Sequence, residues 1–146
     1  MDGHLSDVVT HVTALIGEHR AGAPRLALET RVDPDVPRFA FDPDQLTQVL
    51  WNVSLNSIEA MKGQGRLRIH ARREGNEAVI EVADTGPGIP PNDLRRIFEP
   101  FYSKRSGGTG LGLPIARRIV AAHGGRIDVE SVVGEGTQIL IRLPVT

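Results

Sequence analysis

The sequence contains no cysteine among its 146 residues, which excludes disulfide bonds and thiolate metal sites. No apolar run approaches the roughly 20 residues that a membrane-spanning helix needs. Neither sign of charge is in excess, because 17 lysines and arginines stand against 18 aspartates and glutamates, so no broad basic surface for nucleic acid is expected. These absences favour a protein of a reducing compartment, with the cytoplasm as the default, that contacts neither nucleic acid nor membrane.

The length suits one domain, residues 1–146, with a single hydrophobic core. The sequence shows no internal repeat and no linker rich in glycine, proline or serine that would divide it. Its first residues, Met1-Asp-Gly-His, lack the basic start and the apolar stretch of a signal peptide. The abrupt start is what we expect of a domain excised from a longer protein.

The apolar pattern divides the chain into helices and strands. Helical spacing predicts helices over 5–19, 42–61, 90–98 and 111–122. Alternation predicts strands over 25–32, 38–41, 66–72, 78–84, 126–131 and 137–143, the third and fourth forming an antiparallel hairpin. The expected fold class is α/β, a two-layer sandwich in which a mixed, mostly antiparallel sheet packs against about three helices.

The helix over 42–61 has a strong start signal and an unusual polar stripe. Asp42 is placed to cap it, with Pro43 at the first helical position and Gln45 three residues after the cap. Between two apolar faces runs a narrow stripe made of Gln45, Gln48, Asn52, Asn56 and Glu59. Because asparagine is a poor helix former and charged residues would serve solubility better, we interpret the stripe as the lining of a site rather than a solvated face.

Two glycine-rich stretches point to a nucleotide. Asp84 ends the alternating run 78–83, so its carboxylate is expected at a strand end, where it could accept a hydrogen bond from the exocyclic amine of adenine. Gly86 and Gly88 allow the backbone to turn and to approach a base closely. Further on, four glycines between 107 and 112 lead into a helix whose free N–H groups could meet phosphate. Two such loops at this spacing indicate a nucleotide site.

These motifs resemble the catalytic and ATP-binding domain of sensor histidine kinases. That family lies in the superfamily of gyrase, heat-shock-protein-90, histidine-kinase and mismatch-repair ATPases, whose Bergerat fold is the two-layer sandwich expected here. The matching segments are Asn52 to Met61 (N box), Asp84 to Ile89 and Gly108 to Gly112 (glycine boxes), Phe98 to Phe101 (F box), His123-Gly-Gly, and Gly134 to Thr137. The wording Phe-Glu-Pro-Phe-Tyr-Ser-Lys and Asn-Ser-Ile-Glu-Ala-Met is most similar to kinases of the nitrogen-regulation type.

The resemblance implies a role for each motif. Asn56 would coordinate Mg²⁺, Asn52 would reach the phosphates or their water shell, and Lys104 would bring a positive charge from an ATP lid. These three are the expected catalytic residues. The nucleotide-binding residues that the resemblance implies are Asn56, Asp84, Gly86, Gly88, Ile89, Phe98, Phe101, Lys104, Gly108, Thr109, Gly110, Leu111, Gly112 and Thr137. The lid is expected over about Glu99 to Thr109, poorly ordered until ATP tightens it.

The phosphate acceptor is expected outside this chain. In the family it is a histidine on a separate dimerisation domain, followed by Glu or Asp and then by Arg and Pro. None of the five histidines has that context, so we interpret all of them as structural: His4, His11, His19, His70 and His123. The chain would bind ATP and Mg²⁺ and donate the γ-phosphate to the partner domain in a two-component pathway, upstream of a response regulator.

Two other functions stay open at this stage. One is a protein serine kinase of the anti-sigma-factor type, although those relatives carry glutamate four residues before the magnesium asparagine, where this chain has Asn52. The other is a module that senses ATP or docks partners without catalysis. Four arginines, Arg95, Arg96, Arg117 and Arg118, are interpreted as solvated helix faces.

Overall fold

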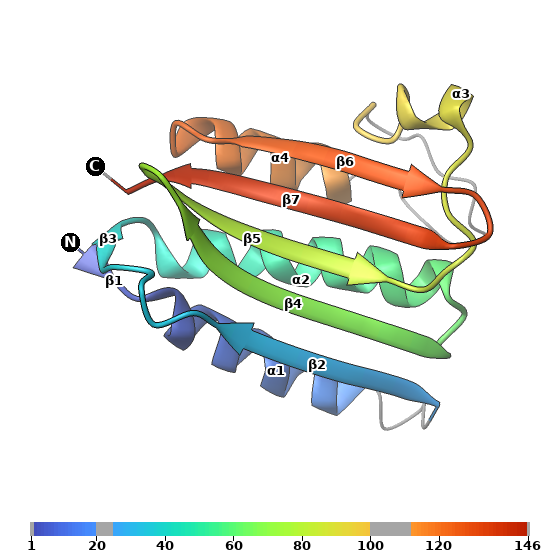
Figure 1. Cartoon of the computed structure of the whole chain (residues 1–146), viewed down its shortest axis with the longest axis horizontal. Helices are drawn as coiled ribbons and strands as arrows, with labels where there is room; N and C mark the ends of the chain where they lie inside the picture. Colours follow the sequence, from blue (N-terminus) through green and yellow to red (C-terminus); the bar gives the residue numbers. More distant parts are fainter. Residues whose placement is uncertain (1, 20–24, 100–111, 146) are drawn as a thin grey trace.

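The computed structural model describes residues 2–19, 25–99 and 112–145 of the chain (Figure 1). Its helices are α1 (Leu5–His19), α2 (Pro43–Ala60), α3 (Pro91–Leu94) and α4 (Gly112–Ala122). Its strands are β1 (Asp2–Gly3), β2 (Leu26–Val32), β3 (Phe39–Ala40), β4 (Gly65–Glu74), β5 (Glu77–Asp84), β6 (Arg126–Val132) and β7 (Gly136–Pro144).

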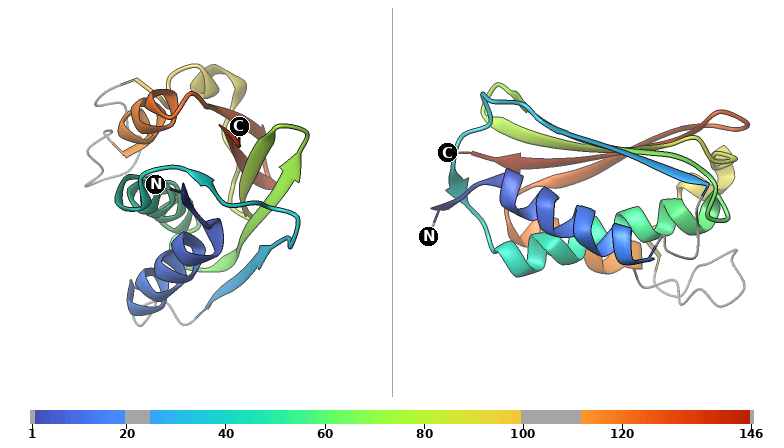
Figure 2. Two further views of the ribbon diagram at one scale, coloured as in Figure 1. Left: turned by 90° about the vertical axis from the view of Figure 1, so that its left-hand side faces the viewer. Right: turned by 90° about the horizontal axis from the view of Figure 1, so that it is seen from below.

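Five strands form one sheet in the order β2-β4-β5-β7-β6. The β2–β4 pair is parallel, and the β4–β5, β5–β7 and β6–β7 pairs are antiparallel. Helices α1, α2 and α4 all lie on one face of this sheet, as the two views of Figure 2 show. The predicted two-layer α/β sandwich with a mixed, mostly antiparallel sheet is therefore confirmed.

The core lies between the sheet and its helices. On β5, the side chains of Ala78, Ile80 and Val82 are fully buried against the helical layer, as the alternation of the sequence predicts. The opposite face of the strand is also covered, because Glu81 there is only 7% exposed. Its carboxylate pairs with Arg68 at 2.6 Å and with a second arginine of β4 at 3.5 Å, which compensates the buried charge.

The start of α2 is fixed at two points. The side chain of Asp42 caps the helix by accepting a hydrogen bond from the N–H of Gln45 at 3.0 Å, which confirms the predicted cap. The backbone N–H of Asp42 donates to Nε2 of His123, just beyond the end of α4, at 3.0 Å. Because Nδ1 of His123 lies 2.9 Å from the carbonyl of Ile119, it carries the ring proton and Nε2 is the acceptor. The imidazole thus joins the start of α2 to the end of α4.

Two described elements differ from the sequence-based prediction. The helix expected over 90–98 is only one turn long, Pro91–Leu94, because Pro90 gives it no side-chain cap and none of its residues is buried. Strand β1 was not predicted, since a two-residue strand carries no alternation, whereas its partner β3 lies within the strand predicted over 38–41. Leu111, expected in the last helix, lies outside the described residues. No helix in the described ranges is long and apolar enough to span a membrane.

Candidate nucleotide-binding site

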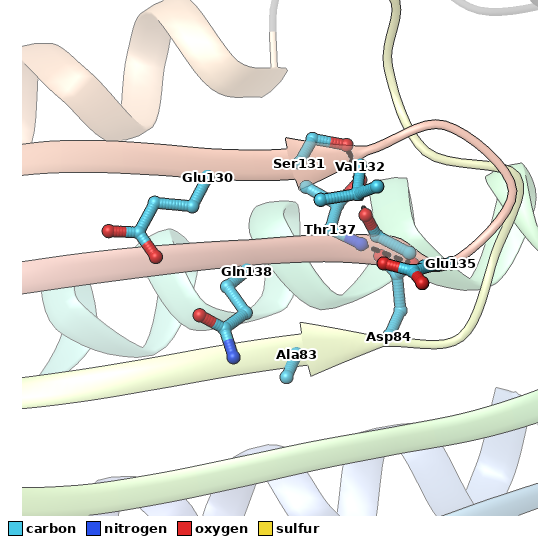
Figure 3. A pocket seen from close by; sticks show the side chains of 9 residues that line it. Ala83, Asp84, Glu130, Ser131, Val132, Glu135, Thr137 and Gln138 are labelled. Carbon is cyan, nitrogen blue, oxygen red and sulfur yellow. Dashed lines mark hydrogen bonds between the residues drawn. The ribbon is translucent and has the colours of Figure 1, made fainter.

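Three side chains meet where β5, β7 and β6 end. Asp84, Thr137 and Ser131 are register partners across the three strands, and Figure 3 shows them side by side. Asp84 is half-buried, and its Oδ1 accepts hydrogen bonds from the backbone N–H of Gly86 at 2.9 Å and of Thr137 at 3.3 Å. Among the described residues, no hydrogen bond reaches the second carboxylate oxygen. Asp84 therefore lies at the predicted strand end with one oxygen fixed and the other available to a ligand.

Ser131 connects this row to the loop that follows Asp84. Its Oγ accepts a hydrogen bond from the N–H of Ile89 at 2.7 Å, donates to the carbonyl of Gly136 at 3.0 Å, and lies 2.9 Å from Oγ1 of Thr137. The sequence reasoning missed this residue. The available signal was its place in the alternation of β6, which puts a polar side chain on the core-facing side of the strand next to Thr137.

Two glycines are required by the packing of loops against each other. Gly88 has φ 76°, and a Cβ at this position would strike the carbonyl of Val132. Gly136 has φ 137°, and a Cβ there would strike the carbonyl of Asp84. A hydrogen bond from the N–H of Gly134 to the carbonyl of Pro87, at 2.8 Å, holds the same two loops together. The β6–β7 hairpin thus fixes the backbone around Asp84.

One of the two asparagines of α2 contacts the N-terminus of α4. Asn52 and Asn56 lie one turn apart and are both half-buried, whereas Glu59, the next polar residue of the stripe, is exposed. The side-chain amide of Asn52 donates to the carbonyl of Gly112, the first residue of α4, at 3.4 Å. Asn52 on the predicted stripe thus lies beside a helix start, where free N–H groups favour anions.

The far end of α2 reaches the loop after Asp84. Met61, which follows the last residue of the helix, lies with its sulfur 3.8 Å from the hydroxyl of Thr85. A Cβ at Gly86 would come within 3.2 Å of the Met61 side chain, so the two pack closely. The end of α2 therefore lies against the loop that follows Asp84.

The F box is described at its first two residues, Phe98 and Glu99. Phe98 is half-buried against the core, and the guanidinium of Arg117 lies over its ring at 5.3 Å from the centroid. Arg117 is exposed, as predicted, but it stacks on Phe98 instead of standing free in solvent. Six other candidate site residues lie outside the described residues: Phe101, Lys104, Gly108, Thr109, Gly110 and Leu111.

A hollow of about 300 Å³ lies at the end of the sheet beside the β6–β7 hairpin. It takes in Asp84, Thr137 and Ser131 from the core-facing side, and Glu130 and Gln138 from the outer face (Figure 3). Asn52 and Asn56 do not line it. No group of three or more histidine, cysteine, aspartate or glutamate side chains that could hold a metal occurs in the described ranges.

Three of the five histidines have local structural contacts, as the sequence reasoning expected. His4 lies at the start of α1 with Nδ1 2.7 Å from the hydroxyl of Ser6. His70 on β4 lies with Nε2 3.0 Å from the carboxylate of Asp33. His123 makes the two bonds described above between α2 and α4. Each of these three imidazoles therefore has a polar partner within the fold.

The chain is similar in sequence to known ATPases and kinases. Residues 41–146 match the family model "Histidine kinase-, DNA gyrase B-, and HSP90-like ATPase". The sensor histidine kinase ZraS of Salmonella typhimurium is 39% identical over 143 residues, which cover 97% of this chain and 30% of ZraS. The sensor protein kinase WalK of Staphylococcus haemolyticus is 36% identical over 141 residues, covering 91% of this chain and 23% of WalK. The chain thus spans less than a third of the length of either relative.

Solved structures with the same fold are also kinases. The nucleotide-free catalytic domain of histidine kinase ThkA superposes with a TM-score of 0.89 at 29% identity, over 100% of this chain and 95% of that chain. Full-length ShkA in complex with AMPPNP superposes with a TM-score of 0.88 at 29% identity, over 99% of this chain and 30% of that chain. ThkA in complex with the response regulator protein TrrA superposes with a TM-score of 0.84 at 26% identity, over 100% of this chain and 42% of that chain.

Proposed function

Because the chain belongs to the family of histidine kinase-, DNA gyrase B- and HSP90-like ATPases, we propose that it is the ATP-binding catalytic domain of a sensor histidine kinase. It binds Mg²⁺-ATP and donates the γ-phosphate to a histidine on a separate dimerisation domain. The observation that carries this proposal is the Asp84 carboxylate, fixed by Gly86 and Thr137 with one oxygen available. That group suits an adenine amine, and Asn52 on the polar stripe of α2 contacts the start of α4, where phosphates could bind.

At the adenine end of the site, the positions of hydrogen-bond donors and acceptors distinguish adenine from guanine. Adenine presents an exocyclic N–H₂ donor where guanine presents a carbonyl acceptor. The second oxygen of Asp84 accepts from the former and repels the latter. Thr137 lies in register beside Asp84 and completes the polar edge, while Gly86, Gly88 and Ile89 form the loop that closes it.

The phosphate end uses α2 and the start of α4. Mg²⁺ prefers oxygen ligands and is usually held by few protein groups together with phosphates and waters, so the amide oxygen of Asn56 fits it. When bound, the cation supplies neutralisation of the phosphate charge. Because Asn52 donates its amide N–H to Gly112, its oxygen is left for phosphate-bound water. The glycine box up to Gly112, with Lys104, is assigned to the phosphates themselves.

The side chains on α2 suit transfer to an acceptor better than hydrolysis. In the hydrolysing members of the superfamily, the position of Asn52 carries a glutamate that activates water, and an amide cannot take that proton. Glu59 is the next carboxylate on the stripe, but its side chain is exposed, whereas Asn52 and Asn56 are half-buried. We therefore assign no general base for water among these three.

The partners follow from the same assignment. The acceptor is a dimerisation domain carrying the phosphoaccepting histidine, in the same full-length protein or in another. Downstream stands a response regulator, in keeping with the ThkA–TrrA complex. We place the domain in the cytoplasm. The nitrogen-regulation type suggested by residues 56–61 and 98–104 stays a prediction, since the relatives compared here are named ZraS and WalK.

A calorimetric titration of the chain with ATP, ADP and GTP, each with and without Mg²⁺, tests this function. We expect adenine nucleotides to bind more tightly than GTP, and ATP to bind more tightly with Mg²⁺ than without it. Equal affinity for ATP and GTP would contradict the assignment of Asp84. Equal affinity for ATP with and without Mg²⁺ would contradict the assignment of Asn56.

A further inference from the structure

The hydroxyl of Ser131 has three partners but a single proton. The N–H of Ile89 donates to it at 2.7 Å, so that contact uses a lone pair of the serine oxygen. The carbonyl of Gly136, at 3.0 Å, can only accept, so the serine proton points there. The third contact, 2.9 Å to Oγ1 of Thr137, must then use the proton of the threonine. The serine oxygen donates once and accepts twice, which exhausts its hydrogen-bonding capacity.

This arrangement fixes which way the Thr137 hydroxyl points. Its proton is directed at Ser131, so it presents only lone pairs to a ligand. The neighbouring Asp84 also presents only an acceptor, because its Oδ1 is occupied by two backbone N–H groups. Thr137 is 8% exposed, so little water competes for its hydroxyl. The end of the sheet thus offers two adjacent acceptors and no side-chain donor from this pair.

We infer that Ser131 is a specificity-determining positioning residue, which holds the Thr137 hydroxyl as an acceptor and thereby favours adenine over guanine. This inference rests on the proposed nucleotide site. At the position of its exocyclic amine, adenine brings a donor to the two acceptors, whereas guanine has a carbonyl there and brings a third acceptor. Without the serine oxygen, the Thr137 hydroxyl is free to rotate and donate to a guanine carbonyl. Ser131 need not touch the nucleotide to exert this effect.

Loss of Ser131 has a second, separable consequence. The N–H of Ile89 and the carbonyl of Gly136 would each lose a partner, which loosens the loop after Asp84. Looser packing weakens every nucleotide alike, because it does not depend on the base. The ratio of ADP affinity to GDP affinity therefore isolates the effect on the Thr137 hydroxyl from a merely structural role.

A matched pair of variants tests the inference. Ser131→Val and Ser131→Thr add the same bulk to a half-buried strand position, and only the threonine keeps the hydroxyl. With calorimetry of ADP and GDP in Mg²⁺, we expect Ser131→Thr to keep the unchanged chain's ADP-to-GDP ratio. The ratio in Ser131→Val should fall by roughly tenfold, the effect of about one neutral hydrogen bond.

A second measurement leaves Ser131 in place and guards against misfolding of its variants. Thr137→Val removes the oriented hydroxyl and should lower the same ratio, whereas Thr137→Ser should keep it. An equal ratio in Ser131→Val and Ser131→Thr, or an unchanged ratio in Thr137→Val, would overturn the inference while leaving the nucleotide site in place. Binding of neither nucleotide by the unchanged chain would contradict the proposed function and, with it, this inference.

Discussion

The carboxylate of Asp84 accepts a hydrogen bond from the backbone N–H of Thr137 at 3.3 Å, although the two residues lie 53 positions apart in the sequence. The same oxygen also accepts from the N–H of Gly86 at 2.9 Å. The carboxylate is therefore oriented before any ligand arrives, which reduces the entropy that binding must supply. A β-bridge between β5 and β7 thus sets the direction of the base-recognising oxygen.

Replacing Asp84 by asparagine should weaken ATP binding by on the order of 1.5–3 kcal/mol, the range for a hydrogen bond to a charged group. The amide oxygen can still accept from Gly86 and Thr137, so its N–H₂ would face the adenine amine as a second donor. Calorimetry with ATP measures the loss. Glu29→Gln is the matched control, since Glu29 is an exposed carboxylate on β2, an edge strand that does not border the hollow. Equal ATP affinity in a folded Asp84→Asn variant would refute the adenine assignment.

Replacing Asn56 by alanine should remove most of the gain in ATP affinity that Mg²⁺ provides, by roughly tenfold or more. The physical reason is the loss of the only protein oxygen that we assign to the cation. Titrations with ATP in Mg²⁺ and in a chelator give the factor. Gln48→Ala removes an exposed amide two turns earlier on the same stripe and should leave that factor unchanged. A Mg²⁺ gain preserved in Asn56→Ala would place the cation elsewhere.

His123→Ala should lower the free energy of unfolding by about 1 kcal/mol, because the N–H of Asp42 and the carbonyl of Ile119 each lose a partner. Urea unfolding followed by far-UV circular dichroism measures the change. His11 on the exposed side of α1 offers the comparison, and His11→Ala should change stability by much less. Equal effects of the two substitutions would mean that the link between α2 and α4 adds nothing.

Acid should destabilise the chain through two carboxylates on the open face of the sheet. The hydrogen bond with His70 lowers the pKa of Asp33 from its usual 3.8, and those from Arg72 and Arg142 lower the pKa of Glu74 from its usual 4.5. A lowered pKa means that the folded state binds fewer protons than the unfolded state. The stabilisation is therefore complete above the usual values and is lost as the pH falls through the folded ones.

The pH dependence is measured by urea unfolding at about pH 7 and at steps down to about pH 3. The free energy of unfolding should decline below about pH 4.5. Asp33→Asn combined with Glu74→Gln should make that decline shallower. The same slope in the double variant would assign the acid sensitivity to other carboxylates.

The sequence predicted the elements whose periodicity is long and whose ends carry a specific signal. The capped helix α2, the β4–β5 hairpin and the strand that ends at Asp84 all occur where the pattern places them. These elements also carry much of the candidate site, because glycine, asparagine and aspartate at fixed offsets reflect local backbone requirements. Such requirements can be read from a single stretch of chain.

Contacts between distant stretches could not be read in this way. The hydroxyl of Ser131 accepts a hydrogen bond from the N–H of Ile89, 42 positions away in the sequence. The local sequence around either residue does not predict this bond. The pairing of His123 with the N-cap of α2 spans 81 positions, and the sequence indicated only that the histidine was structural. The helix expected after Pro90 was too long because the local propensity there receives no support from burial.

A single-turnover assay with ATP labelled on the γ-phosphate tests the central claim most directly. The chain is mixed with the labelled ATP and Mg²⁺, with and without a dimerisation domain that carries a phosphoaccepting histidine, and both free phosphate and labelled protein are followed. We predict slow phosphate release by the chain alone and acid-labile label on the added domain. Rapid release that Glu59→Gln abolishes would show a hydrolase, and acid-stable label on a serine would show a serine kinase; either result would contradict the account.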